Sequence, residues 1–103
     1  MIVVDTNVVV SLFVSSPSTS LAKEAAHKDG HWIMPTLWLS EMRSVPVPSQ
    51  GVLEYAAESG CSAYDCEFVT LAVLAETRLV TLDKRLALRF PRIATPLDRF
   101  VGA

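Results

Sequence analysis

The sequence predicts an α/β fold with a mostly parallel sheet. Short runs of β-branched and apolar residues alternate along the chain with longer segments of helical pattern, which is typical of βαβ units. The chain has 103 residues, of which 50% are hydrophobic and 19% charged, so a disordered chain is excluded. Single domains cluster near ~100–150 residues. We therefore expect one domain over residues 1–103 with one modest core.

Four segments are expected to form strands. Ile2-Val3-Val4 and Leu79-Val80-Thr81 are continuous apolar runs of the kind found in strands buried on both faces. Trp32-Ile33-Met34 is a third, closed by Pro35, and Arg92-Ile93-Ala94-Thr95 is a weaker fourth.

Helical patterns separate these strands, and most of them stop at a glycine or a proline, which commonly end helices. The two prolines of the segment 45–49 favour an extended path there. The expected helices are Ser18–Lys28, Thr36–Val45, Ser49–Ser59, Ser62–Thr77 and Lys84–Phe90, with a last turn at Pro96–Val101.

The composition predicts a cytoplasmic protein without a membrane span. No run approaches the ~20 apolar residues of a span, and the apolar N-terminus carries Asp5 without a basic leader. The net charge of −2 does not indicate nucleic-acid binding, although six of the nine basic residues lie after position 77. Cys61 and Cys66 fit neither a disulfide framework nor a metal-binding pair, so we expect packing thiols.

An acidic residue follows each of the two most apolar strands. Asp5 follows the first strand, and Asp83 follows the segment 79–82. Ligands of open parallel sheets bind outside the carboxyl ends of the strands, so both acids are expected to project toward that edge. The alternative for each is an N-cap, because aspartate is favoured at that position and a helix can begin after both.

Glu41 lies in the apolar arc of a predicted helix, between Leu37 and Val45 at about 100° per residue. No basic residue stands four positions away on either side. Burying an unpaired carboxylate costs several kcal/mol, so Glu41 is expected to have a partner or a metal. The alternative is a rotated helix with Glu41 at its rim.

Asp65 also belongs to an apolar helical stripe, with Phe68, Val69 and Ala72 at the following helical positions. The spacing Ser62-x-x-Asp65 is also a variant of the capping box, which satisfies amides at a helix N-terminus. The two roles are compatible, because one oxygen can cap while the other binds a ligand.

Four converging carboxylates would require a cation. Two like charges ~4 Å apart repel by roughly 4 kcal/mol at an effective dielectric constant near 20. Mg²⁺ is typically held by a few carboxylates and waters, and such ions polarise phosphoryl oxygens and generate hydroxide in phosphodiester hydrolysis. His27 and His31 are isolated in the sequence, so it predicts no zinc site.

Four segments resemble, in order, the acidic motifs of the PIN domain, and above all those of VapC-type toxins from bacterial toxin–antitoxin pairs. The segments are Met1-Ile2-Val3-Val4-Asp5-Thr6-Asn7, Pro35-Thr36-Leu37-Trp38-Leu39-Ser40-Glu41, Ser62-Ala63-Tyr64-Asp65-Cys66-Glu67-Phe68-Val69-Thr70-Leu71-Ala72 and Leu79-Val80-Thr81-Leu82-Asp83-Lys84-Arg85-Leu86. The resemblance extends from residue 1 to the C-terminus.

The resemblance implies a three-layer α/β/α sandwich and a metal-dependent endoribonuclease. Thr6 and Asn7 would be polar residues that orient the first acid. The antitoxin of such a pair would be a protein partner, and single-stranded or loop RNA the substrate. The catalytic and metal-binding residues, for Mg²⁺ or Mn²⁺, would be Asp5, Glu41, Asp65 and Asp83, and the cations that contact RNA would be Arg43, Lys84, Arg85 and Arg89.

The sequence departs from the family between the second and third motifs, where a helical hairpin is missing. Its loss would expose Leu37, Trp38 and Val45, and an exposed apolar patch predicts a homodimer or a higher oligomer. The alternative function is therefore a shortened, catalytically impaired binding module that engages an antitoxin or associates with itself. A phosphotransfer domain with Asp5 as acceptor is disfavoured, because no lysine stands at a late strand end.

Overall fold

The computed structural model describes residues 1–35, 44–45 and 60–102. In this part of the chain, five strands form one sheet in the order β3-β2-β1-β4-β5, and every neighbouring pair is parallel. The expected α/β fold with a mostly parallel sheet is therefore confirmed. The strands are β1 (Ile2–Val4), β2 (Trp32–Pro35), β3 (Ser44–Val45), β4 (Leu79–Thr81) and β5 (Ala94–Pro96).

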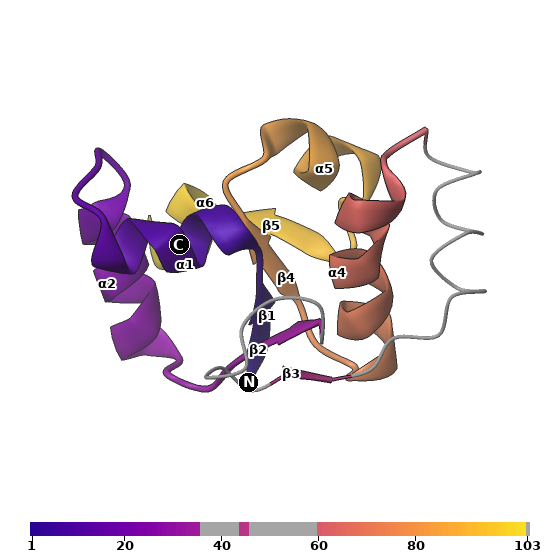
Figure 1. The fold of residues 1–103 in the computed structure, drawn as a ribbon, viewed down its shortest axis with the longest axis horizontal. Helices are drawn as coiled ribbons and strands as arrows, with labels where there is room; N and C mark the ends of the chain where they lie inside the picture. The colour runs from indigo at the N-terminus through magenta and orange to yellow at the C-terminus, as the bar shows by residue number, and fades with distance from the viewer. Residues whose placement is uncertain (36–43, 46–59, 103) are drawn as a thin grey trace.

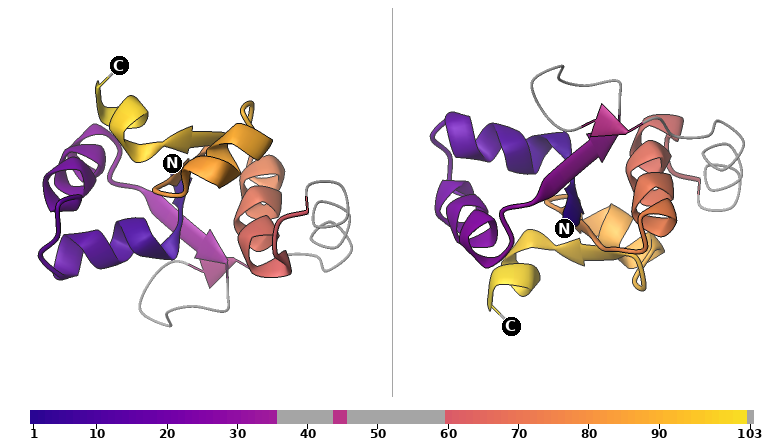
Figure 2. Two further views of the ribbon diagram at one scale, coloured as in Figure 1. Left: turned by 90° about the horizontal axis from the view of Figure 1, so that it is seen from above. Right: turned by 90° about the horizontal axis from the view of Figure 1, so that it is seen from below.

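Helices cover both faces of the sheet, which gives three layers (Figures 1 and 2). α2 packs against α1 and α6 on one side, and α4 packs on β1, β2 and β4 on the other side, where α5 follows β4. No described helix is long and apolar enough to cross a membrane. The described helices are α1 (Thr6–Phe13), α2 (Thr19–Lys28), α4 (Ala63–Leu74), α5 (Lys84–Arg89) and α6 (Leu97–Gly102).

The expected helix over Thr36–Val45 is wrong at its last two residues. Ser44 and Val45 form β3, which pairs in parallel with β2 through Met34 and Pro35. The physical reason is Pro46, because a residue before proline is pushed from the helical into the extended region. The rest of that segment, with Leu37, Trp38, Glu41 and Arg43, lies outside the described residues, and so does the expected helix Ser49–Ser59.

The other expected elements occur with shifted ends. α4 stops at Leu74, three residues before the expected end, because Glu76 takes a left-handed conformation with φ of 52°. The Thr77 amide then bonds back to the Ala72 carbonyl, which closes the helix. β5 begins two residues later than expected and takes in Pro96, so α6 starts at Leu97.

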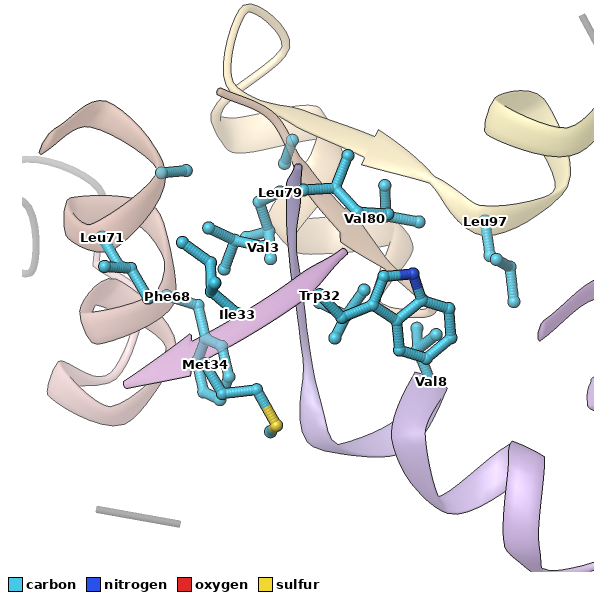
Figure 3. Packing of buried hydrophobic residues seen from close by; sticks show 14 of the residues in the cluster. Val3, Val8, Trp32, Ile33, Met34, Phe68, Leu71, Leu79, Val80 and Leu97 are labelled. Carbon is cyan, nitrogen blue, oxygen red and sulfur yellow. The ribbon is translucent and has the colours of Figure 1, made fainter. Parts of the chain in front are cut away.

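The core lies on both faces of the two central strands, β1 and β4. Figure 3 shows Phe68 and Leu71 of α4 beside Ile33 on one side of the sheet, and Val8 and Leu97 beside Trp32 on the other. Full burial of such a side chain contributes roughly 1.5–3 kcal/mol. The tight packing of β1 against β4 fixes the position of the residues that follow them. Cys66 is buried and Cys61 half-buried, and the two do not form a disulfide, as expected for packing cysteines.

Candidate active site

Asp5 is a buried carboxylate at the carboxyl end of β1. Its Oδ1 accepts the Val8 amide at 3.0 Å and thereby caps the N-terminus of α1, so the alternative role as an N-cap is confirmed. Its Oδ2 accepts the Leu82 amide at 3.2 Å and the hydroxyl proton of Thr81. Asp5 therefore joins the end of β1 to the end of β4, which are neighbouring strands.

Thr81 links the two strand-end aspartates. Its side chain is fully buried, and its Oγ1 donates to Asp5 while accepting the Asp83 amide at 2.9 Å. Asp83 in turn caps α5, because its Oδ1 accepts the amides of Arg85 at 2.9 Å and Leu86 at 3.2 Å. Within the described part of the chain, no hydrogen bond reaches Oδ2 of Asp83. Asp83 also lines a hollow at this edge of the sheet.

Burial raises the pKa of Asp5 above its ordinary value, because desolvation disfavours the charged carboxylate. The hydrogen bonds from Thr81, Val8 and Leu82 pull the pKa back down, and the negative charge of Asp83 raises it further. The influence of Asp83 means that the two carboxylates interact electrostatically. Ionised together, they form a site that favours a cation.

The raised pKa of Asp5 predicts how stability depends on pH without divalent metal. The folded protein holds the Asp5 proton more tightly than the unfolded chain, so stability is lost as pH rises from about 3.8 through the folded pKa. We expect the thermal midpoint of the wild type in EDTA to fall, relative to that of Asp5→Asn, between pH 4 and 7. The pKa of Asp29 is lowered, mainly by its hydrogen bond to the N-terminal ammonium. Asp29 therefore changes the stability of the protein with pH only below about pH 3.8. Parallel midpoint curves for the two proteins would contradict this expectation.

Asp65 lies in the first turn of α4, beside a hollow that it shares with Asp83. The Asp65 amide donates to the Ser62 hydroxyl at 3.1 Å, which confirms that Ser62 caps this helix. The hollow holds about 320 Å³, and Arg85 and Arg89 of α5 also line it. Two acidic and two basic residues, Asp65, Asp83, Arg85 and Arg89, therefore line one space.

A hydrogen bond between side chains connects α4 to α1. The hydroxyls of Thr6 and Tyr64 share a hydrogen bond of 2.7 Å, and the Tyr64 ring packs edge-on against Phe68. Thr6 follows Asp5 and Tyr64 precedes Asp65, so this bond sets the distance between the helix turns that carry the two acids. The resemblance implies that Thr6 and Asn7 orient Asp5, but the described hydrogen bonds of Asp5 come instead from Val8, Thr81 and Leu82.

Thr81 and Tyr64 are the residues that sequence reasoning missed. A threonine inside a buried strand, two positions before Asp83, is the signal for Thr81. Tyr64 carries no comparable signal, because its partner Thr6 is 58 residues away.

The three described cations of the predicted RNA contact set lie on α5. Arg85 and Arg89 line the hollow of Asp65 and Asp83, whereas Lys84 lines a separate groove on the other side of the helix. The remaining predicted cation, Arg43, and the remaining acid, Glu41, lie outside the described residues.

Three of the four predicted acids lie at one edge of the sheet, namely Asp5, Asp65 and Asp83. Among residues 1–35, 44–45 and 60–102, no three Asp, Glu, His or Cys side chains are grouped closely enough to hold a metal ion. Asp83 is the common member of two pairs, one with Asp5 through Thr81 and one with Asp65 across the hollow.

No model of a known protein family matches the chain, and no curated protein is significantly similar to it.

Proposed function

We propose that this protein is a metal-dependent endoribonuclease of the PIN type, which hydrolyses phosphodiester bonds in single-stranded or loop RNA. The observation that carries the proposal is the pairing of two aspartates at the carboxyl ends of neighbouring parallel strands. Asp5 and Asp83 are joined there by Thr81, next to a hollow where Asp83 meets Asp65 and two arginines. This edge is where ligands of open parallel sheets bind.

The chemistry of these side chains fits Mg²⁺ or Mn²⁺. Both ions prefer oxygen ligands, and the described donors are carboxylates, one of them buried with a raised pKa beside a second negative charge. Asp5, Asp65 and Asp83 would hold the metal, together with Glu41. When bound, the metal would supply neutralising charge and lower the pKa of a water molecule.

Each residue of the site would then have its own role in hydrolysis. Asp83 would offer Oδ2 to the metal, because its Oδ1 is committed to the cap of α5. Asp5 would use the remaining lone pair of Oδ1, which accepts the Val8 amide, because Oδ2 already accepts both the Thr81 hydroxyl and the Leu82 amide. Arg85 and Arg89 would hold substrate phosphate, as guanidinium groups do through paired hydrogen bonds. One of the carboxylates would accept the proton of the attacking water.

Cleavage of a mixed pool of single-stranded RNA tests this proposal. We expect cuts in Mn²⁺ that disappear in EDTA and that fall by at least about 100-fold in Asp5→Asn, since even residues behind the ligands change metal-site activity 10–100-fold. Asp29→Asn is the matched control, because Asp29 binds the N-terminal ammonium at the opposite end of β1. Equal cleavage by both variants, or cleavage that persists in EDTA, would overturn the proposal.

The second candidate function is a binding module that has lost catalysis and engages an antitoxin or a second copy of itself. An exposed apolar surface at the end of α1 favours it. Val10 and Phe13 are three residues apart on α1, Val14 directly follows the helix, and all three are exposed, with the Phe13 side chain 77% exposed. Large exposed apolar residues that gather in this way commonly mark protein interfaces.

Light scattering on the eluted protein tests self-association through this surface. We expect the wild type to have at least twice the monomer mass and Phe13→Ser to elute as a monomer with an unchanged thermal midpoint. Leu74→Ser is the matched control, because Leu74 is also exposed but lies on α4. A wild type that stays monomeric at high concentration would exclude this surface as a self-interface.

A further inference from the structure

A groove of about 670 Å³ lies between α5 and α6 along β5, apart from the hollow of Asp65 and Asp83. Its floor is apolar and its rim is charged. Leu88 is 79% exposed, so a large apolar side chain is presented at the groove with little of its surface buried. The residues that matter most to its chemistry are Lys84, Leu88, Pro91, Pro96, Asp98 and Arg99.

The groove lies in the basic part of the chain. Six of the nine basic residues follow position 77, but only two of the eleven acidic residues do, although the whole chain has a net charge of −2. The two acids are Asp83, which caps α5, and Asp98, whose Oδ1 accepts the Arg99 amide at 2.8 Å. The groove itself is lined by two cations, Lys84 and Arg99, and one acid, Asp98, so its lining has an excess of positive charge that suits an anionic ligand.

The groove also adjoins the candidate active site. Lys84, at one end of the groove, directly follows Asp83, and α5 separates the groove from the hollow. Arg85 and Arg89 of α5 line the hollow, whereas Lys84 and Leu88 of the same helix line the groove. A strand that places a phosphate beside Asp83 can therefore cross the first turn of α5 and continue into the groove.

We propose that this groove binds the single-stranded RNA that flanks the cleaved phosphate. Lys84 and Arg99 bind its phosphates, and the apolar floor with Leu88 and the two prolines contacts an unstacked base or ribose. The proposal rests on the proposed ribonuclease function and adds the path of the substrate. RNA is favoured over an acidic protein segment because Lys84, which lines the groove, directly follows Asp83, beside which a phosphodiester would be cut.

Binding of a labelled single-stranded RNA oligonucleotide in EDTA, followed by fluorescence anisotropy, tests the groove without cleavage. We expect the double variant Lys84→Ala, Arg99→Ala to bind at least tenfold more weakly. Its log–log salt slope should be smaller by roughly 0.7 for each lost phosphate contact. Leu88→Ala should weaken binding about threefold without changing the slope, which separates apolar contact from charge. Its exposure means that the substitution leaves the fold intact.

Two matched controls and one competitor complete the test. Lys23→Ala removes an exposed cation from α2, and Leu74→Ala removes an exposed leucine from α4; neither should change affinity. If the control variants weaken RNA binding as much as the groove variants do, or if the groove variants have no effect, the proposal that RNA binds in the groove is overturned. If polyglutamate displaces the RNA and Leu88→Ala has no effect, the groove binds an acidic protein segment instead, and the RNA proposal is also overturned. Binding that depends on the groove but is never followed by cleavage in Mn²⁺ overturns the proposed function alone.

Discussion

Saturating Mn²⁺ is expected to raise the thermal midpoint of the wild-type protein by roughly 10–20 °C, and Asp5→Asn should abolish most of this rise. A ligand that binds only the folded state stabilises it by about 2.7 kcal/mol when present at 100 times its dissociation constant. For a domain of this size, each kcal/mol shifts the midpoint by roughly 4–8 °C. The metal also relieves the repulsion between Asp5 and Asp83, which adds a smaller contribution.

The matched comparison for this experiment is again Asp29→Asn. Asp29 is an aspartate with a hydrogen-bonding role, but it lies at the amino end of β1, away from the strand ends that carry Asp5 and Asp83. This variant should retain the full Mn²⁺-induced rise, whatever its midpoint without metal. A wild type with no rise, or an equal loss in both variants, would mean that the strand-end aspartates do not form a metal site. A rise without RNA cleavage would favour the binding module over the enzyme.

The strands of the sheet could be predicted because each is indicated by a run of a few consecutive apolar residues. Continuous runs such as Ile2-Val3-Val4 are favourable only where both faces of a strand are buried, and β1 and β4 are buried in this way. The positions of Asp5 and Asp83 follow from the same signal, since each is the first polar residue after a buried strand. Their caps follow from local chemistry as well, because an aspartate before a helix accepts amides of its first turn.

α1 and β3 were less predictable, because local preference and tertiary context compete there. Val8-Val9-Val10 is a β-branched run that favours a strand by propensity, yet it is helical in α1. The Asp5 cap and the burial of Val8 and Val9 in the core outweigh that preference. β3 has only two residues, and its parallel pairing with β2 has no counterpart in the pattern of the sequence itself.

The connections within the site depend on long-range register, which a single sequence does not reveal. Thr81 and Asp5 are 76 positions apart in the sequence. Their side chains meet only because β1 pairs with β4 in the register that places Val4 opposite Val80. The bond between Thr6 and Tyr64 likewise depends on how α4 docks beside α1. The sequence therefore predicts which acids gather at the carboxyl edge, whereas the residues that hold them in place emerge from the packing.

Thr81→Val should destabilise the protein by about 3 kcal/mol and lower its thermal midpoint by roughly 10–20 °C. Valine keeps the shape of threonine but removes the hydroxyl. The Asp83 amide then has no acceptor, and Asp5 keeps only its backbone donors. Each buried polar group left unpaired costs about 1–3 kcal/mol. The change also raises the pKa of Asp5 further, because the Thr81 hydrogen bond lowers it.

Thr81→Ser separates the hydroxyl from the shape of the side chain. Serine keeps the donor to Asp5 and the acceptor for Asp83 but loses one methyl, so it should cost only about 1 kcal/mol. In the valine variant, the higher pKa of Asp5 means that protons compete more strongly with metal. Its Mn²⁺ affinity should therefore be reduced most at low pH and recover as pH rises, whereas the serine variant should follow the wild type. Equal midpoints for the two variants, or a pH-independent loss of affinity in Thr81→Val, would show that the hydroxyl does not hold Asp5 in its ionised form.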